Sequence, residues 1–260
     1  MSYQTLLLHV GSGVATVTLN RPEELNSIDD DMRRDFADLG EELAGNPDIR
    51  VVVITGAGRA FSAGGSVAHF EREWNPSEFR LHSRRLSAFF DELEALEKPV
   101  IAAMNGAATG AGLQLAMACD LRIASEKARM GYREHRLGLI PGHGGATRLV
   151  KLIGLSQAKG LYFHGDLVDA EEAYRIGLVH EVVAPAALLE TVKRRAQELA
   201  ARAPASLGLT KRLLNGAADV DVHTGHLLES FAQSIAIKTE DHREGLKAFR
   251  EKRDPEFRGE

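Results

Sequence analysis

Two short segments rich in glycine and alanine are the parts of this sequence best suited to chemistry at the backbone. Residues 56–65, "GAGRAFSAGG", follow the apolar run 51–55, and residues 107–112, "AATGAG", follow the apolar run 98–106. Segments with so few side chains can present free N–H groups at the start of a helix, where the helix dipole adds a positive potential. Two such N–H groups aimed at one point would form an oxyanion hole, which stabilises negative charge on a carbonyl oxygen.

Two other interpretations of these segments stay open at this stage. Each segment can be a close-packing turn of an ordinary α/β fold, because glycine avoids the collision that a Cβ atom would cause. A glycine-rich turn after a strand can also bind the pyrophosphate of a dinucleotide. The dinucleotide alternative fits poorly, since "GAATGAG" does not match G-x-G-x-x-G and no acidic residue is placed for a ribose.

A single polar residue, Gln114, lies within the apolar run 111–118 that follows the second segment. Its amide can hold a water molecule or a substrate group by hydrogen bonds, but it cannot take up or release a proton. The alternative is a buried amide whose hydrogen bonds are all satisfied within the core.

The order of the predicted elements indicates an α/β fold. Residues 5–10 and 14–19 predict a hairpin across "GSG", and apolar runs predict buried strands at 51–55, 98–106 and 120–125. Helical patterns cover 29–44, 78–96, 111–118, 144–161, 169–176, 185–202 and most of 204–252, whereas 128–145 is predicted to be mostly loop. Strands that alternate with helices are typical of parallel β-α units. We therefore expect a spiral or layered core over residues 1–195 and a helical part over 196–260.

The composition is that of an ordinary globular protein and excludes several classes of partner. Of 260 residues, 44% are hydrophobic and 27% are charged. The net charge of -5 argues against nucleic acid and gives no strong attraction to a membrane surface. No run approaches the roughly 20 apolar residues of a membrane span, and no secretory signal pattern is present. The single cysteine, Cys119, is expected to be a buried hydrophobic residue, so we expect no disulfide and a cytoplasmic location.

Six segments of the chain, in order, resemble those of the crotonase superfamily, the enoyl-CoA hydratase/isomerase family. They are "LNRPEELNS", "VVVITGAGRAFSAGG", "KPVIAAMNGAATGAGLQLAMACDLRIAS", "LGLIPGHGGATRL", "EEAYRIGLVHEVV" and "AFREKRDPEF". The resemblance implies a crotonase-type spiral of β-α units, with a helical C-terminal part that forms a homotrimer or a dimer of trimers. It also implies an acyl-CoA thioester as substrate, an enolate intermediate and no cofactor beyond the coenzyme A of the substrate. It does not select one reaction, because this fold hosts hydration, isomerisation, thioester hydrolysis and C–C cleavage.

The resemblance assigns the two oxyanion-hole donors to the N–H groups of Gly65 and Ala111. Ala63, Gly64 and Gly110 are the neighbouring residues expected to line the substrate. Losing one donor of such a pair costs roughly 3–4 kcal/mol of transition-state stabilisation, so the two N–H groups would carry much of the catalysis.

Hydratases of the family use two glutamates to handle a water molecule, and the matching positions here are Gln114 and Glu134, 20 residues apart. Glu134 is thus the only member of the pair that can move a proton. A single base beside an enolate favours isomerisation of a 3-enoyl-CoA to a 2-enoyl-CoA. The alternatives are hydration of a 2-enoyl-CoA with Gln114 orienting the water, and a non-catalytic acyl-CoA-binding protein. Without the resemblance, Glu134 would be interpreted as a surface carboxylate paired with Arg133 or Arg136.

The resemblance also suggests contacts at the two ends of the ligand. Arg21 and Leu25 match contacts of CoA, and Phe249 and Lys252 match an aromatic residue and a lysine that a neighbouring subunit supplies near the CoA phosphate. The acyl pocket is expected to be walled by residues 67–90 and by the C-terminal helices. Four aromatic side chains there suggest room for an apolar acyl chain: Phe70, Trp74, Phe79 and Phe89.

Three histidines, His69, His135 and His143, lie near these loops in the sequence. Their spacing does not match a metal site, so we expect surface or loop-packing roles and no metal. The side chain of His135 is expected to point away from that of its neighbour Glu134. Ser66 stands where many relatives have an aspartate, and its hydroxyl is expected to structure the loop.

Overall fold

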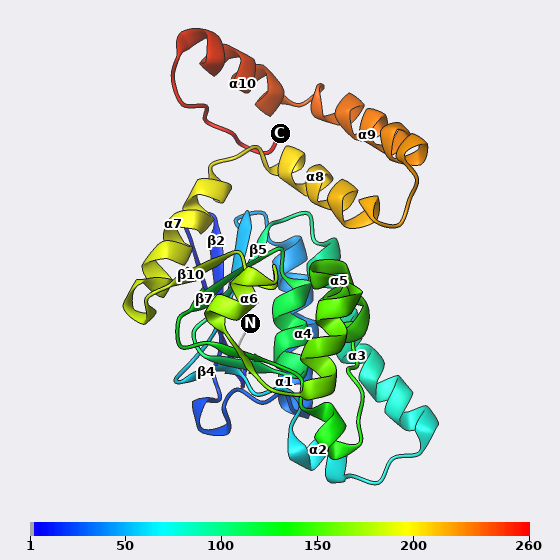
Figure 1. Cartoon of the computed structure of the whole chain (residues 1–260). Coiled ribbons are helices and arrows are strands. Elements are labelled where there is room, and N and C mark those ends of the chain that lie inside the picture. The colour runs from blue at the N-terminus through cyan, green and yellow to red at the C-terminus, as the bar shows by residue number, and fades with distance from the viewer. Residues whose placement is uncertain (1–2) are drawn as a thin grey trace.

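A six-stranded sheet lies at the centre of the protein in the computed structural model, which describes residues 3–260 (Figure 1). The strand order is β1-β2-β3-β5-β7-β10, and every neighbouring pair is parallel except the β1–β2 hairpin. The bounds are β1 Leu6–Gly11, β2 Val14–Leu19, β3 Val51–Gly56, β5 Val100–Met104, β7 Leu121–Ser125 and β10 Glu181–Val183. The predicted hairpin and the three predicted buried strands are confirmed, whereas β10 is a short strand that the sequence pattern did not indicate.

A smaller second sheet contains β4 Ala60–Ser62, β6 Ala107–Thr109, β8 Arg129–Gly131 and β9 Val168–Asp169, in that order. Each of the strands β4, β6 and β8 follows a strand of the large sheet after a short corner, so each turn of the chain adds one strand to both sheets. The corners are tight. A Cβ atom on Gly56 would lie 2.3 Å from the carbonyl oxygen of Ala60, and one on Gly106 would lie 2.0 Å from that of Arg59. The expected spiral of β-α units is therefore confirmed.

The segment 128–145 is only partly the loop that the sequence predicts. It contains β8 and a 3₁₀ helix, Glu134–Leu137, before the chain enters the next helix. A strand of three residues and a single helical turn are too short to show a periodic pattern, which is why the sequence analysis missed them. These two elements fix the position of Glu134.

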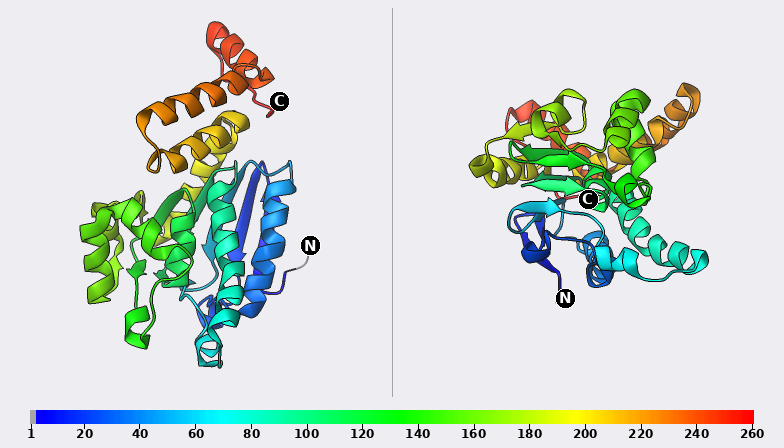
Figure 2. Two further views of the ribbon diagram at one scale, coloured as in Figure 1. Left: turned by 90° about the vertical axis from the view of Figure 1, so that its right-hand side faces the viewer. Right: turned by 60° about the horizontal axis from the view of Figure 1, so that its bottom comes forward.

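Helices connect the strands and cover the large sheet on both faces (Figures 1 and 2). Their bounds are α1 Asp30–Gly45, α2 Val67–Glu71, α3 Pro76–Ala95, α4 Ala111–Ala118, α5 Gly145–His164, α6 Ala170–Arg175, α7 Leu188–Ala200, α8 Pro204–Ala217, α9 Val222–Ala236 and α10 Glu240–Glu251. Capping side chains explain where α1 and α3 begin. Asp29 accepts a hydrogen bond from the Met32 N–H at the start of α1, and Asn75 accepts one from the Glu78 N–H at the start of α3.

Both faces of the central strands are buried, as their apolar sequences predict. Along β3, Val52 and Ile54 belong to the larger hydrophobic core, which includes side chains of α1, α3 and α4. Val51 and Val53 face the opposite way and pack with side chains of α7. Successive side chains of a strand point to opposite faces, so a strand can be apolar throughout only when both faces are covered.

The core extends through the whole of α7, because Val192, Ala196 and Ala200 all pack on the strands. The boundary expected after residue 195 therefore falls inside this helix. Beyond it, α8, α9 and α10 stand away from the two sheets, as both figures show. No helix among residues 3–260 has the length and apolar character needed to cross a membrane.

A buried ion pair attaches α8 to the core. The ammonium group of Lys211 lies 2.8 Å from the Asp120 carboxylate and donates hydrogen bonds to the carbonyl oxygens of Leu93 (2.8 Å) and Lys98 (3.1 Å). The Lys211 side chain is only 7% exposed. Its charge is therefore shared among three acceptors that have little access to water.

We expect Lys211→Met to lower the free energy of unfolding by about 3 kcal/mol, because it leaves a partly buried carboxylate and two carbonyl groups without their donor. This value is at the lower end of the usual range, since the Asp120 side chain is 23% exposed. Urea unfolding followed by circular dichroism measures the change. Lys193→Met, at an exposed position of α7, removes the same charge and should change the unfolding free energy little. Equal effects of the two substitutions would contradict the prediction.

Candidate active site

Backbone hydrogen bonds fix the direction of the Gly65 amide. Gly65 and Ile28 form a parallel bridge, in which the Ile28 N–H donates to the Gly64 carbonyl (2.7 Å) and the Ser66 N–H donates to the Ile28 carbonyl (3.2 Å). Successive N–H groups of an extended segment point to opposite sides. The Gly65 N–H therefore points away from Ile28, and within residues 3–260 it donates no hydrogen bond.

The first loop lies directly against the second. Gly64 has a φ of +91°, a conformation that favours glycine. A Cβ atom there would lie 2.5 Å from the Thr109 carbonyl oxygen and 3.1 Å from the backbone nitrogen of Ala111. The Thr109 hydroxyl also donates to the Ala63 carbonyl oxygen (2.8 Å). Small residues stand where the backbones of the two loops touch, and this contact brings the second amide close to the first.

The second amide lies at the start of α4. Gly110 precedes the helix with a φ of +52°, and Ala111 is the first helical residue. The N–H groups of the first turn have no acceptor four residues back, and in the described part of the chain the Ala111 N–H donates no hydrogen bond. The helix dipole adds a positive potential at this end. Two such amides can together stabilise an oxyanion.

Glu134 lies beside the same helix start. A Cβ atom on Gly110 would lie 3.2 Å from Glu134 Oε1. The strand β8 holds this position, since the Gly110 N–H donates to the Gly131 carbonyl (3.2 Å). The Arg133 N–H donates to Glu134 Oε2 (2.9 Å). Burial raises the pKa of Glu134, and the backbone hydrogen bonds oppose this shift only in part.

The interpretation of Glu134 as half of a surface ion pair is not supported. Arg133 contributes only its backbone N–H, and the guanidinium of Arg136 lies 3.6 Å from Asp166 instead. Within residues 3–260 the Glu134 carboxylate forms no ion pair with any side chain. It is thus a partly buried carboxylate without a counter-charge, beside two free backbone amides.

Gln114 is buried but not satisfied. Its side chain is 1% exposed, and its Nε2 donates to Glu134 Oε1 across 3.4 Å. Its Oε1 is buried without a hydrogen-bond partner among the described residues. Gly145 makes room for this side chain, because a Cβ atom there would lie 2.9 Å from it. Buried polar atoms of a core are nearly always paired. The unpaired Oε1 therefore does not fit the alternative of an amide whose hydrogen bonds are all satisfied within the core.

The raised pKa of Glu134 predicts the pH dependence of any reaction in which it acts as a base. A base must be ionised to accept a proton, so turnover should fall as the pH decreases through this pKa. Because burial places the pKa above the ordinary 4.5, the fall should occur at a higher pH than for an exposed glutamate. A pH profile of kcat/KM with an acyl-CoA that does not ionise in its acyl group measures it. An acid limb at or below pH 4.5 would contradict the prediction.

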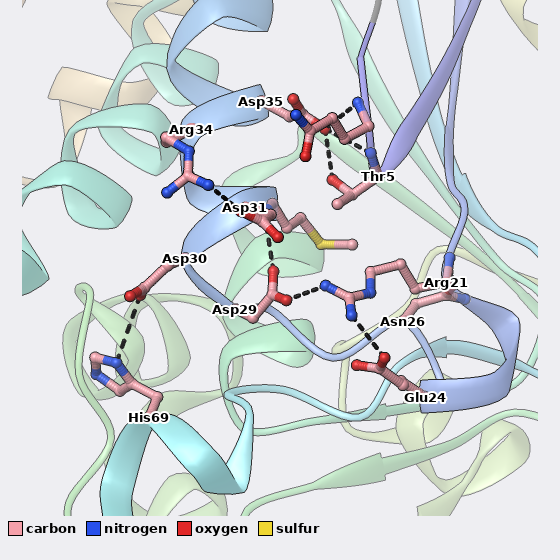
Figure 3. Close-up of polar contacts among 12 residues, drawn as sticks. Thr5, Arg21, Glu24, Asn26, Asp29, Asp30, Asp31, Arg34, Asp35 and His69 are labelled. Atoms are coloured by element: carbon pink, nitrogen blue, oxygen red, sulfur yellow. Dashed lines mark hydrogen bonds and ion pairs between the residues drawn. The ribbon is translucent and has the colours of Figure 1, made fainter. Parts of the chain in front are cut away.

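Arg21 and Leu25, the expected CoA contacts, lie in the turn before α1. The Leu25 carbonyl accepts a hydrogen bond from the Ala63 N–H (2.9 Å), so this residue adjoins the first loop. The Arg21 guanidinium is bound by Glu24 (2.6 Å) and by Asp29, as Figure 3 shows. Both residues adjoin the site, but Arg21 faces carboxylates of its own chain, and its contact with CoA stays a prediction.

Phe249 and Lys252 lie at the end of α10, and Phe249 is 84% exposed. In Figures 1 and 2, α10 is at the opposite end of the molecule from α2. These residues therefore do not reach the site of their own chain. Their expected role in the site of a neighbouring subunit stays a prediction.

Phe89 does not join the other aromatic side chains around α2, contrary to expectation. It is 1% exposed and stacks on Phe36 of α1, with ring centroids 4.5 Å apart, so it belongs to the core between α1 and α3. Phe70 does adjoin the site, because a Cβ atom on Gly65 would lie 2.9 Å from its ring. The helical period of α3 places Phe89 on the buried face, and only the packing against α1 shows what it contacts.

A cluster of polar side chains that the sequence analysis missed joins three helices. His69 Nδ1 of α2 lies 3.8 Å from Asp30 Oδ1 of α1, as Figure 3 shows. His82 Nε2 of α3 lies 2.9 Å from the same oxygen. The rings of Trp74 and Phe79 lie 5.1 and 6.0 Å from the His69 ring, and His69 is buried. No sequence signal could have found this cluster, because its members are far apart in the chain.

The atoms of Asp30, His69 and His82 that could bind a metal ion lie within 4.8 Å of one another. Burial, followed by the charge of Arg33, lowers the pKa of His69 to about 4, and burial also lowers the pKa of His82. Neutral imidazoles can bind metals. The positive charge of Arg33 acts on both rings, however, and opposes a cation, so we assign no metal to this cluster.

The other two histidines pack loops. His143 Nδ1 lies 2.9 Å from the Ser87 hydroxyl of α3, which agrees with the expected loop-packing role. The His135 ring lies against Tyr162, with centroids 5.9 Å apart, and its side chain points away from the site as expected.

Comparison with known proteins agrees with this geometry. A family model described as enoyl-CoA hydratase/isomerase matches residues 9–260. The chain belongs to the enoyl-CoA hydratase/isomerase family. It is therefore an enzyme of this family, and its fold is the crotonase-type spiral that the sequence resemblance implied.

The names of several proteins similar to this chain specify a reaction. It is 39% identical to the short-chain-enoyl-CoA hydratase of Clostridium acetobutylicum, over 97% of each chain. It is 37% identical to the 1,2-epoxyphenylacetyl-CoA isomerase of Escherichia coli, over 98% of each chain. The crystal structure of an enoyl-CoA hydratase from Bacillus anthracis matches with a TM-score of 0.94 and 36% identity, over 99% of this chain and 100% of that one. Similar proteins thus include hydratases and an isomerase.

Proposed function

We propose that this enzyme moves a proton within an acyl-CoA thioester and converts a 3-enoyl-CoA into a 2-enoyl-CoA. The observation that carries the proposal is the pair formed by one carboxylate, Glu134, and one amide, Gln114, 3.4 Å apart beside the start of α4. One ionisable group is enough to remove a proton and return it. Adding water across a double bond usually engages a second acid or base, which an amide cannot supply.

The proposed reaction uses the two free amides and the carboxylate together. The thioester oxygen accepts hydrogen bonds from the N–H groups of Gly65 and Ala111. The Glu134 carboxylate takes a proton from C2, and the bonding electrons form an enolate whose oxygen the two donors stabilise. The protonated Glu134 then returns the proton to C4, and the double bond moves from C3–C4 to C2–C3. Glu134 ends ionised as it began, and no cofactor is needed besides the coenzyme A of the substrate.

Hydration of a 2-enoyl-CoA is the second candidate, and two observations favour it. Most of the similar proteins with a specific name are hydratases, as in Clostridium acetobutylicum and Syntrophomonas wolfei. The unpaired Oε1 of Gln114 can accept a hydrogen bond from a water molecule. Glu134 would then take the proton of that water and return it to C2. Lacking a second acid or base, this reaction would be slower by about 10²–10⁴ than in a site with two.

One experiment distinguishes the two reactions. The purified protein is incubated with a 3-enoyl-CoA in D₂O, and the products are followed by mass spectrometry and NMR. Isomerisation yields a 2-enoyl-CoA before any 3-hydroxyacyl-CoA is formed. If the 3-enoyl-CoA is left unchanged while a 2-enoyl-CoA gains water, the isomerase proposal is wrong and the hydratase alternative replaces it.

The substitution Gln114→Glu should increase hydration of a 2-enoyl-CoA at least tenfold, because it supplies the second acid and base. The new carboxylate would lie close to that of Glu134, so the two would share a proton and one pKa would rise further. Initial rates of hydration and isomerisation are compared for the variant and the unchanged protein. Gln114→Met, which fills similar space without a polar group, is the control and should not gain hydration. Equal rates in Gln114→Glu and Gln114→Met would contradict the prediction.

We infer that the protein works as a homotrimer or a dimer of trimers. The helices α9 and α10 expose large apolar side chains that nothing in residues 3–260 covers, namely Leu227, Leu228, Phe231, Ile235, Leu246 and Phe249. Such a surface is typical of an interface between subunits. In such an assembly, Phe249 and Lys252 of one subunit could reach the active site of a neighbouring subunit, although they do not reach the site of their own chain. Light scattering after size exclusion measures the mass, and a stable active monomer would contradict it.

A further inference from the structure

A cavity of about 420 Å³ beside α1 and α3 has an unusually basic lining. Its charged residues are the arginines Arg33, Arg34, Arg72 and Arg85 and the aspartates Asp30 and Asp38. Four arginines against two aspartates leave a formal excess of two positive charges. His82 adds none near pH 7, since burial lowers its pKa. We call this site the arginine cavity.

Three of these guanidinium groups are unpaired. Within residues 3–260, Arg33, Arg72 and Arg85 form no ion pair and their side chains donate no hydrogen bond, whereas Arg34 is paired with Asp31. Arg33 is 5% exposed, and its Nε and Nη1 atoms are buried without a partner. Arg72 stacks over the Trp74 ring at 4.2 Å, which leaves its N–H groups available. A buried charged group such as Arg33 is nearly always paired, and two further unpaired guanidinium groups lie beside it, so the cavity is suited to an anion.

The position of the arginine cavity relative to the oxyanion-hole amides suggests which anion it binds. The segment 25–30 runs beside the first loop, with the Leu25 carbonyl bonded to the Ala63 N–H and Ile28 paired with Gly65. Asp30, at the lining of the cavity, lies two residues beyond Ile28. Spacings of about 3.3 Å per residue and 4.8 Å between strands place Asp30 within roughly 10 Å of Gly65.

The same segment gives a direction along the substrate. Leu25, at one end, is an expected contact of CoA, and Asp30, at the other end, adjoins the arginine cavity. The helix α2 spans the same interval, because Phe70 contacts Gly65 while Arg72, just after the helix, lines the cavity. An acyl chain that leaves the thioester at Gly65 away from CoA therefore runs toward the arginines.

We propose that the arginine cavity binds a carboxylate at the far end of the acyl chain, so that the substrates are CoA thioesters of dicarboxylic acids. The proposal rests on the proposed function, because it places the thioester carbonyl at Gly65. A guanidinium group binds a carboxylate through two parallel N–H···O bonds, which gives both charge and geometry. The buried Arg33 supplies a fixed donor, and the more exposed Arg72 and Arg85 close around the anion. The proposed acyl chain therefore ends in a carboxylate, whereas the aromatic residues alone suggested a fully apolar acyl chain.

The test compares two substrates of equal length, 3-octenoyl-CoA and its ω-carboxy analogue, with shorter and longer homologues of each pair. For at least one length, kcat/KM of the unchanged protein should be about ten to a hundred times higher for the carboxylated substrate. Arg33→Gln and Arg85→Gln should each reduce this ratio at least tenfold. Arg85 is exposed, so its substitution remains informative even if the Arg33 variant does not fold. Arg84→Gln is the matched control on the same helix, lies outside the cavity lining and should leave both rates unchanged.

Two further measurements separate this inference from its alternatives. Calorimetry measures the binding of the ω-carboxy acyl-CoA to the unchanged protein and to Arg85→Gln. Because binding is measured without turnover, this result tests the cavity even if the proposed reaction is not found. Free glutarate and free phosphate are then added to assays with 3-octenoyl-CoA. If either anion binds in the cavity and changes that rate while the carboxylated substrates gain no preference, the cavity is a separate anion site and the proposal is overturned. A ratio near one for every length, or a preference that Arg33→Gln and Arg85→Gln leave intact, also overturns it.

Discussion

Replacing Glu134 by glutamine should lower turnover of the acyl-CoA substrate by about 10²–10⁴ while leaving acyl-CoA binding nearly unchanged. The amide has the shape of the carboxylate and can still accept the hydrogen bond from the Arg133 N–H, but it cannot move a proton. No other ionisable side chain is within hydrogen-bond distance of Gln114 in residues 3–260, so nothing nearby can replace the lost base. Steady-state kinetics and calorimetric titration with the product acyl-CoA measure the two effects.

The thermal stability of Glu134→Gln shows whether a loss of activity comes from the missing base or from a disrupted fold. Burial raises the pKa of Glu134, which means that the folded protein holds its charged form at a cost. A neutral glutamine avoids that cost, so Glu134→Gln should unfold at the same temperature as the unchanged protein or slightly higher. Glu126→Gln, at an exposed position between β7 and β8, is the matched control and should keep full activity. Turnover of Glu134→Gln within about tenfold of normal would rule out Glu134 as the base. If the unchanged protein binds acyl-CoA but turns over none, the non-catalytic alternative is correct.

Replacing Ala111 by proline should lower kcat by about 10²–10³, because it removes one oxyanion-hole donor. Ala111 is the first residue of α4, a position where proline is well tolerated, since its N–H has no partner within the helix. The substitution therefore removes the hydrogen-bond donor with little cost to the helix. The proline ring also occupies space at the point where the thioester oxygen is expected, which adds to the loss.

Ala111→Gly is the control for this experiment. It keeps the N–H and loses only one methyl group from a side chain that is 7% exposed, so kcat should stay within a fewfold of normal. Circular dichroism and thermal unfolding show whether the proline variant remains folded. A folded Ala111→Pro protein with unchanged kcat would mean that this amide does not stabilise the transition state, and the proposed oxyanion hole would have to be abandoned.

Much of the architecture could be predicted from local pattern. The β1–β2 hairpin follows from two strand-like runs across "GSG", the buried strands β3, β5 and β7 follow from short continuous apolar runs, and the long helices follow from a period of 3.6 residues. The elements that were missed are short. They include the strands β4, β6, β8, β9 and β10 and the 3₁₀ helix at Glu134, with two to four residues each, and α2 with five. The short strands exist because neighbouring strands of the spiral offer them hydrogen-bond partners, and a local pattern does not contain that information.

The sequence by itself determined the residue types at the site. Two loops without side chains, one glutamate and one amide in place of an acid limit the chemistry to backbone stabilisation of an oxyanion and transfer of one proton. The sequence also determined the family, because the motifs that carry the resemblance extend along nearly the whole chain.

Only the tertiary structure decided how these groups meet and what surrounds them. In the described part of the chain, the Gly65 N–H is free because its neighbours pair with Ile28, and the Gln114 oxygen is unpaired because the core around it offers no donor. The arginine cavity forms only when α1, α2 and α3 come together, since its arginines are spread from Arg33 to Arg85. Hydrogen bonding, burial and charge pairing depend on the distances between residues that are far apart in the sequence. Those distances are set only when the chain folds.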